Sequence, residues 1–155
     1  DTGAYIDGFH GDAARTFGVG QISEQRQRLI DITKESFFEG VKLVKVGNYL
    51  NKVSAAIQDY VESNGYGVVR DYVGHGIGRD MHEDPEIPNY RTGRPGPKLV
   101  KGMTLAIEPM VTVGTYKVHT LPNRWTVVTN DGSDSAHYEN TVLVTDNEPE
   151  LLTLV

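Results

Sequence analysis

Apolar residues recur every three or four positions in two stretches of the chain, residues 23–45 and residues 49–64. This spacing places them on one face of a helix. Ser23 precedes the first stretch as a suitable N-cap, and Gly47 follows it as a helix stop. The second stretch ends in an Asn-Gly pair, which is typical of a helix C-terminus. The pattern therefore predicts two amphipathic helices.

The rest of the chain consists of short apolar and β-branched runs separated by turn residues, as is typical of strands. An Asp-Gly pair at 7–8 predicts a hairpin turn between strands at 1–6 and 9–19. Prolines and glycines predict a loop at 85–98, and polar residues predict a connection at 114–124. Further strands are expected at 68–73, 103–113, 125–129, 135–145 and 149–155. The fold class that follows is α+β.

Composition narrows the class of protein. At 155 residues the chain is expected to form one domain or a piece of one, and its start at Asp1 within a predicted strand indicates an N-terminally truncated piece. A net charge of −6 argues against nucleic-acid binding, and the absence of cysteine excludes thiolate sites. No apolar run approaches a membrane span and the given residues contain no signal-peptide pattern. The lack of cysteine fits a reducing compartment, and a cytoplasmic location is expected.

Alternating glycines mark the stretch at 74–85, which also carries His75 and His82. Each glycine in a helix interior costs roughly 1 kcal/mol relative to alanine, so a helix is disfavoured here. A strand end that opens into a close-packed turn fits the pattern better. On such a framework a histidine can be a metal ligand, an acid or base, or a structural hydrogen-bonding group.

Several charged residues occur within or beside predicted strands: Asp1, Asp12, His75, Glu108 and Glu139. If a sheet directs them to one point, the carboxylates repel one another unless cations neutralise them. Oxygen ligands with one imidazole suit Mn²⁺, Fe²⁺, Co²⁺ or Zn²⁺, and a pair of such ions acidifies a shared water for hydrolysis of a carbonyl or phosphoryl group. The residues alone also allow solvated carboxylates and structural histidines, and they identify no substrate.

Five segments resemble type I methionine aminopeptidase, in that family's order and with closely similar spacing: residues 7–12, 74–85, 102–110, 125–126 and 138–141. The resemblance covers the whole chain but not the whole family domain, because the N-terminal part that normally precedes Asp1 is missing. It implies the C-terminal portion of the pita-bread (creatinase/aminopeptidase) fold, with a curved antiparallel sheet backed by the two helices.

The same resemblance implies roles for individual residues. The ligands of two divalent ions (Co, Mn, Fe or Zn) would be Asp1, Asp12, His75, Glu108 and Glu139. Glu108 would also shuttle a proton from the activated water to the leaving amine. His82 would hydrogen-bond the scissile amide and its tetrahedral intermediate.

Other positions match less completely. Met81 and Trp125 fall where the family lines its methionine pocket, although an aromatic residue is common at the position of Met81. Asn140 stands where histidine is usual, and Ser135 falls at a position that can ligate a monovalent cation. His137 alternates with Tyr138 on its strand and is expected to face solvent.

The resemblance implies that residues 1–155 are a single catalytic domain that removes the N-terminal methionine from peptides or nascent chains. A position close to the ribosome is an expectation that goes with this activity. Without the missing segment the chain is expected to be inactive or poorly selective. One alternative is an Xaa-Pro aminopeptidase or prolidase, which shares the fold and the five metal ligands. Another is a non-catalytic binding module on the same fold, which would be expected to lose ligands, whereas this sequence keeps all five.

Overall fold

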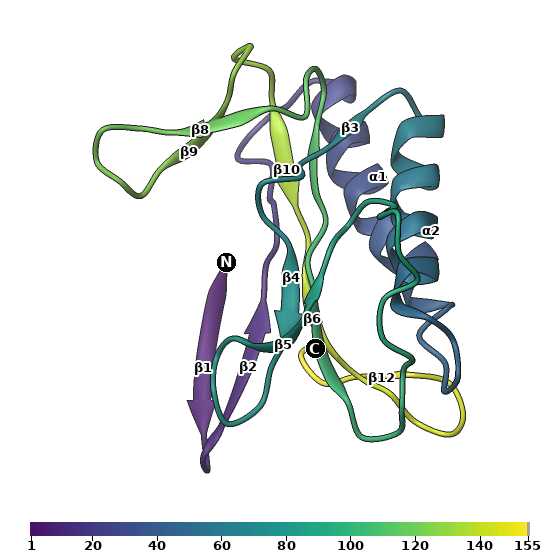
Figure 1. Cartoon of the computed structure of the whole chain (residues 1–155). Helices are drawn as coiled ribbons and strands as arrows, with labels where there is room; N and C mark the ends of the chain where they lie inside the picture. Colours follow the sequence, from purple (N-terminus) through teal and green to yellow (C-terminus); the bar gives the residue numbers. More distant parts are fainter. Residues whose placement is uncertain (155) are drawn as a thin grey trace.

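The computed structural model describes residues 1–154, and Figure 1 shows its α+β architecture. The helices are α1 (Glu24–Val41) and α2 (Leu50–Ser63). The strands are β1 (Thr2–Ile6), β2 (Phe9–Ala13), β3 (Gly67–Val68), β4 (Gly74–Gly76), β5 (Glu83–Ile87), β6 (Thr104–Ile107), β7 (Met110–Thr112), β8 (Val118–Thr120), β9 (Val127–Thr129), β10 (Ser135–His137), β11 (Asn140–Leu143) and β12 (Glu150–Leu151). The predicted fold class is confirmed.

The strands form two small hairpins and two larger sheets, and every described pairing is antiparallel. The larger sheets have the orders β12-β11-β6-β4-β5 and β10-β7-β3. Helices α1 and α2 lie side by side against one side of these sheets, and the β1–β2 hairpin lies on the other side (Figure 1). The β8–β9 hairpin projects from the body of the molecule.

Apolar side chains of the helices fill the space against the sheets. The larger core cluster joins Phe37 of α1 and Ile57 of α2 to Leu105 and Ile107 of β6, all with no measurable exposure. Burial of such side chains contributes roughly 1.5–3 kcal/mol each, so this layer holds β6 rigidly. Among residues 1–154, no helix is both long enough and apolar enough to cross a membrane.

The first helix begins as predicted, because Ser23 Oγ accepts a hydrogen bond from the Arg26 amide at 3.3 Å. It ends at Val41, however, before the predicted end at residue 45. Val44 is fully buried in the turn that follows, so its apolar character reflects core packing outside the helix. Helix α2 matches its predicted bounds to within one residue at each end.

Several predictions about the β structure were wrong, and the predicted strand at 9–19 ends at Ala13. The predicted strand at 68–73 is mostly a turn between β3 and β4, and the predicted loop at 85–98 overlaps β5. Pro85 fits in β5 because this strand is at the sheet edge, where the missing amide hydrogen leaves no neighbour unpaired. The predicted polar connection at 114–124 also contains β8.

The Asp-Gly hairpin was predicted correctly. Asp7 and Gly8 have φ values of 51° and 86°, as a turn with two positive φ angles requires. The register pairs Gly3 with Asp12. Strand β2, which contains Asp12, contacts β11 of the five-stranded sheet.

Candidate metal centre

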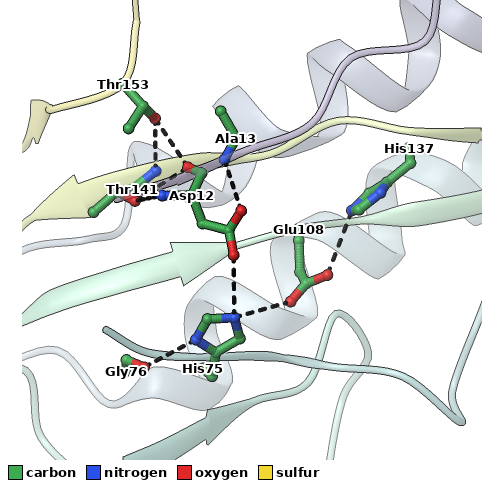
Figure 2. A network of polar contacts seen from close by, with 8 residues as sticks. All are labelled: Asp12, Ala13, His75, Gly76, Glu108, His137, Thr141 and Thr153. Carbon is green, nitrogen blue, oxygen red and sulfur yellow. Dashed lines mark hydrogen bonds and ion pairs between the residues drawn. The ribbon is translucent and has the colours of Figure 1, made fainter. Parts of the chain in front are cut away.

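His75 lies on β4, between β5 and β6 in the five-stranded sheet. Its Nδ1 is 2.9 Å from the carbonyl oxygen of Gly76. A carbonyl oxygen only accepts, so Nδ1 donates and Nε2 presents a lone pair. This is the arrangement of a metal-binding histidine. Nε2 faces Asp12 Oδ2 at 3.9 Å and Glu108 Oε1 at 3.7 Å (Figure 2).

Glycines on both sides of His75 are required by the neighbouring backbone. A Cβ at Gly74 would lie 2.2 Å from the carbonyl oxygen of Ala106, and one at Gly76 would lie 2.1 Å from that of Asp84. Neither backbone atom can move without breaking strand pairing. The close-packed turn predicted from the glycine pattern is confirmed, and it fixes the position of His75.

We expect Gly76→Ala to destabilise the protein by about 3 kcal/mol, since the added methyl group overlaps a backbone oxygen. Thermal unfolding followed by circular dichroism measures this loss. Gly93→Ala is the matched control, because a Cβ at Gly93 meets nothing within 4 Å. Equal melting temperatures for the two variants would contradict the packing described for β4.

Asp12 on β2 is held by two threonines on other segments (Figure 2). Its amide donates to Thr141 Oγ1 at 2.9 Å, and its carbonyl accepts from Thr141 and Thr153 hydroxyls at 3.1 and 3.2 Å. The amide of Ala13 donates to Asp12 Oδ1 at 3.0 Å. These contacts leave Oδ2 directed at His75.

Glu108 follows β6 directly and is anchored through its backbone, whose carbonyl accepts from Asn89 Nδ2 at 3.1 Å. Its carboxylate lies between two imidazoles. Oε1 faces His75, and Oε2 is 3.4 Å from Nε2 of His137. The glutamate in the middle of an apolar run therefore points toward His75 and His137, and its role as a ligand stays a prediction.

Glu139, in the connection from β10 to β11, is only 1% exposed. Among residues 1–154, neither of its carboxylate oxygens has a hydrogen-bond partner. Burial, followed by the negative charges of Glu108 and Asp12, raises the pKa of Glu139 to about 9. A buried carboxylate with no donor facing it is costly unless a cation binds there.

The donor atoms fit divalent ions. Ligand atoms of Asp12, His75 and Glu139 lie within 4.8 Å of one another, as do those of Glu108, His137 and Glu139. Ligands at about 2.0–2.2 Å from one ion are separated by no more than about 4.4 Å, so a small adjustment would close the Asp12, His75 and Glu139 group around an ion. Glu139 belongs to both groups and is suited to bridge two ions.

A cavity of about 670 Å³ lies beside this group and is lined by Glu108 and Asp1, but not by Asp12 or Glu139. His75, Glu108 and His137 line its floor together with apolar residues such as Val73 and Met110. This volume lies in the range of small-ligand sites, which combine apolar walls with a few converging polar groups.

The structure brings the predicted metal ligands together with one exception. Asp12, His75, Glu108 and Glu139 converge, whereas Asp1 is exposed, lines the cavity and belongs to neither group of donor atoms. The ligand role of Asp1 stays a prediction.

The predicted substrate-binding residues occupy different positions. His82 lines the cavity, and its ring centroid lies 4.4 Å from that of His75. Trp125 also lines the cavity, but it is 87% exposed and precedes β9. Met81 is half-buried with its methyl group close to Gly3, and it is not among the cavity-lining residues. Ser135 lines the cavity, and its monovalent-cation role stays a prediction.

Sequence reasoning missed His137. It was expected to face solvent, but only 24% of its side chain is exposed and its Nε2 is buried. Strand alternation was correct, since Tyr138 packs on Phe37 in the core and His137 takes the opposite face. That opposite face borders the cavity. The proximity of His137 to Glu139 in sequence was the available signal.

An α+β fold that directs an imidazole and buried carboxylates at one point beside a cavity defines a metal-binding class of protein. The chain belongs to metallopeptidase family M24, whose family model matches residues 1–146.

Similar proteins agree with this assignment. The chain is 67% identical to a methionine aminopeptidase from Clostridium acetobutylicum over 99% of its own length, but it spans only 62% of that relative. The crystal structure of a Thermotoga maritima methionine aminopeptidase superposes with a TM-score of 0.95 at 51% identity, with 99% of this chain and 61% of the other covered. The structure of a prolidase from Pyrococcus furiosus superposes with a TM-score of 0.74 at 27% identity. This superposition covers 99% of this chain and 40% of the prolidase. The predicted pita-bread fold is thereby confirmed.

Proposed function

We propose that this chain provides the metal centre of an aminopeptidase that removes N-terminal methionine from peptides and nascent chains. The observation that carries the proposal is the buried carboxylate of Glu139, which lacks a protein donor and faces Asp12, Glu108 and His75. Burying such a group of side chains is costly unless a cation neutralises it or Glu139 keeps a proton. The remaining expected ligand is Asp1, which lines the same cavity.

Two divalent ions, of Co, Mn, Fe or Zn, would supply Lewis acidity and lower the pKa of a water in the site. The protein side chains then carry the other steps. Glu108 takes the proton from the attacking water and delivers it to the departing amine. His82 donates a hydrogen bond to the carbonyl oxygen of the first residue as negative charge develops there.

The cavity supports an exopeptidase rather than an endopeptidase. Its apolar residues, including Val73 and Met110, offer contacts to one unbranched apolar side chain beside the carboxylates. Asp1 and Glu108 at the cavity offer a negative environment for a free α-amino group. Methionine at a chain N-terminus presents both features.

The comparisons favour methionine over an Xaa-Pro substrate. Structures of methionine aminopeptidases resemble the chain at 41–51% identity, whereas the prolidases and Xaa-Pro dipeptidase resemble it at 24–27%. The non-catalytic alternative is disfavoured because His75, Glu108 and the other predicted ligands are all present.

A peptide assay tests the proposal. We define the extended chain as this chain with the N-terminal segment of the Clostridium acetobutylicum relative fused ahead of Asp1. With Mn²⁺ or Co²⁺ present, it should cleave a Met-Ala peptide at least 100-fold faster than an Ala-Pro peptide, a difference of about 2.7 kcal/mol in transition-state binding. The chain alone and an EDTA-treated sample are the controls. Faster Xaa-Pro cleavage would replace this proposal with the prolidase alternative.

A further inference from the structure

His137 contacts the proposed proton-transfer residue but has no role in the reaction as set out above. Its Nε2 lies 3.4 Å from Glu108 Oε2 and is buried, and within residues 1–154 it makes no hydrogen bond. A buried polar atom without a partner is unusual. Contacts of this length at catalytic carboxylates often shorten once the site is loaded.

The backbone of His137 is fixed on both sides. Its amide donates to Thr16 Oγ1 at 2.9 Å, and its carbonyl accepts from the same hydroxyl at 3.0 Å. Across the sheet it pairs with Met110, two residues beyond Glu108. The imidazole is therefore directed at Glu108 by a rigid strand.

The two imidazoles that flank Glu108 have different roles (Figure 2). His75 donates from Nδ1 to Gly76, so its Nε2 has no proton to give Glu108 and would instead hold a cation together with it. Within residues 1–154 no hydrogen bond fixes which ring nitrogen of His137 carries the proton, so its Nε2 can donate to Glu108 Oε2. Oε1 of Glu108 would then be available to an ion, and Oε2 would accept a hydrogen bond from His137.

We propose that His137 is a positioning residue, which donates from Nε2 to Glu108 Oε2 and so holds this glutamate to one metal-binding oxygen. The inference rests on the proposed function of Glu108 and adds a residue to it. Without the donor, Oε2 would be free to face a bound ion as well, and Glu108 could hold the ion through both oxygens. Its orientation toward the substrate is then lost.

Two substitutions separate donation from packing. His137→Gln can place an amide N–H near the position of Nε2, whereas His137→Leu fills the space without a donor. In the extended chain we expect His137→Leu to lower kcat by about 10–100-fold while KM stays within about threefold of wild type. We expect His137→Gln to keep kcat within about threefold of wild type. His119→Gln, on the exposed β8–β9 hairpin, is the matched control.

Visible absorption of the Co²⁺-loaded protein gives a readout that needs no substrate. A bidentate Glu108 raises the coordination number, so His137→Leu should weaken and shift the Co²⁺ bands, whereas His137→Gln should match wild type. Equal kcat and spectra for His137→Leu and wild type would overturn the proposal. The proposal would also be overturned if His137→Gln lowered kcat as much as His137→Leu does. A loss of Co²⁺ affinity of 100-fold or more in both variants would overturn it too, because His137 would then be a metal ligand.

These outcomes are separate from failure of the proposed function. If wild type binds Co²⁺ but cleaves no Met-Ala peptide, the methionine assignment fails while the spectra still test His137. Melting temperatures of both His137 variants close to that of wild type show that the fold is kept.

Discussion

Glu139→Gln should make the chelator-treated protein more stable at pH 8, by on the order of 2–3 kcal/mol. The pKa of Glu139 is raised from 4.5 to about 9, chiefly by burial and then by Glu108 and Asp12. Between these pH values the folded protein holds a proton that the unfolded chain has released. Stability therefore falls as pH rises from about 4.5 to 9, and glutamine removes this dependence.

Urea unfolding of metal-free protein between pH 5 and pH 9 measures this effect. The wild-type free energy of unfolding should decline across the range, and the curves of wild type and Glu139→Gln should converge at the acid end. Glu86→Gln, an exposed change on β5, is the matched control and should follow wild type. Parallel curves for wild type and Glu139→Gln would contradict the burial and repulsion described for this carboxylate.

Glu108→Gln should lower kcat of the extended chain for a Met-Ala peptide by about 10³-fold, within the 10²–10⁴-fold range of general acid–base catalysis. Glutamine keeps an oxygen toward His75 but cannot accept and return a proton. We expect only a modest loss of metal affinity, which calorimetry on the same sample checks. A kcat within tenfold of wild type at full metal occupancy would exclude Glu108 as the proton carrier.

The sequence indicated which side chains converge better than it indicated the strands of the sheet, and the metal-binding and catalytic roles of these side chains stay predictions. Gly74 and Gly76 indicated correctly that β4 is packed against backbone, and Glu108 stood out because an apolar run surrounds it. These signals are local. They follow from steric limits and from the cost of a charge among apolar neighbours.

The wrong predictions, of strands, loops and the exposure of His137, concern positions whose structure depends on segments far away in the sequence. Pro85 indicated a loop, but a sheet edge accommodates it, and the turn at 70–73 looked like a strand because its apolar residues line the cavity. The alternation of His137 with Tyr138 was predicted correctly, yet alternation does not reveal whether the second face meets solvent or another segment. Here that face meets Glu108.

Titration of the chelator-treated protein with Mn²⁺ in a calorimeter tests the metal centre most directly. The wild type should bind divalent ions, and its melting temperature should rise, since saturation at 100 times Kd contributes about 2.7 kcal/mol. Glu139→Gln should bind at least 100-fold more weakly, because the residue common to both donor groups has lost its charge. Wild type that binds no Mn²⁺, Co²⁺, Fe²⁺ or Zn²⁺, with an unchanged melting temperature, would contradict the account.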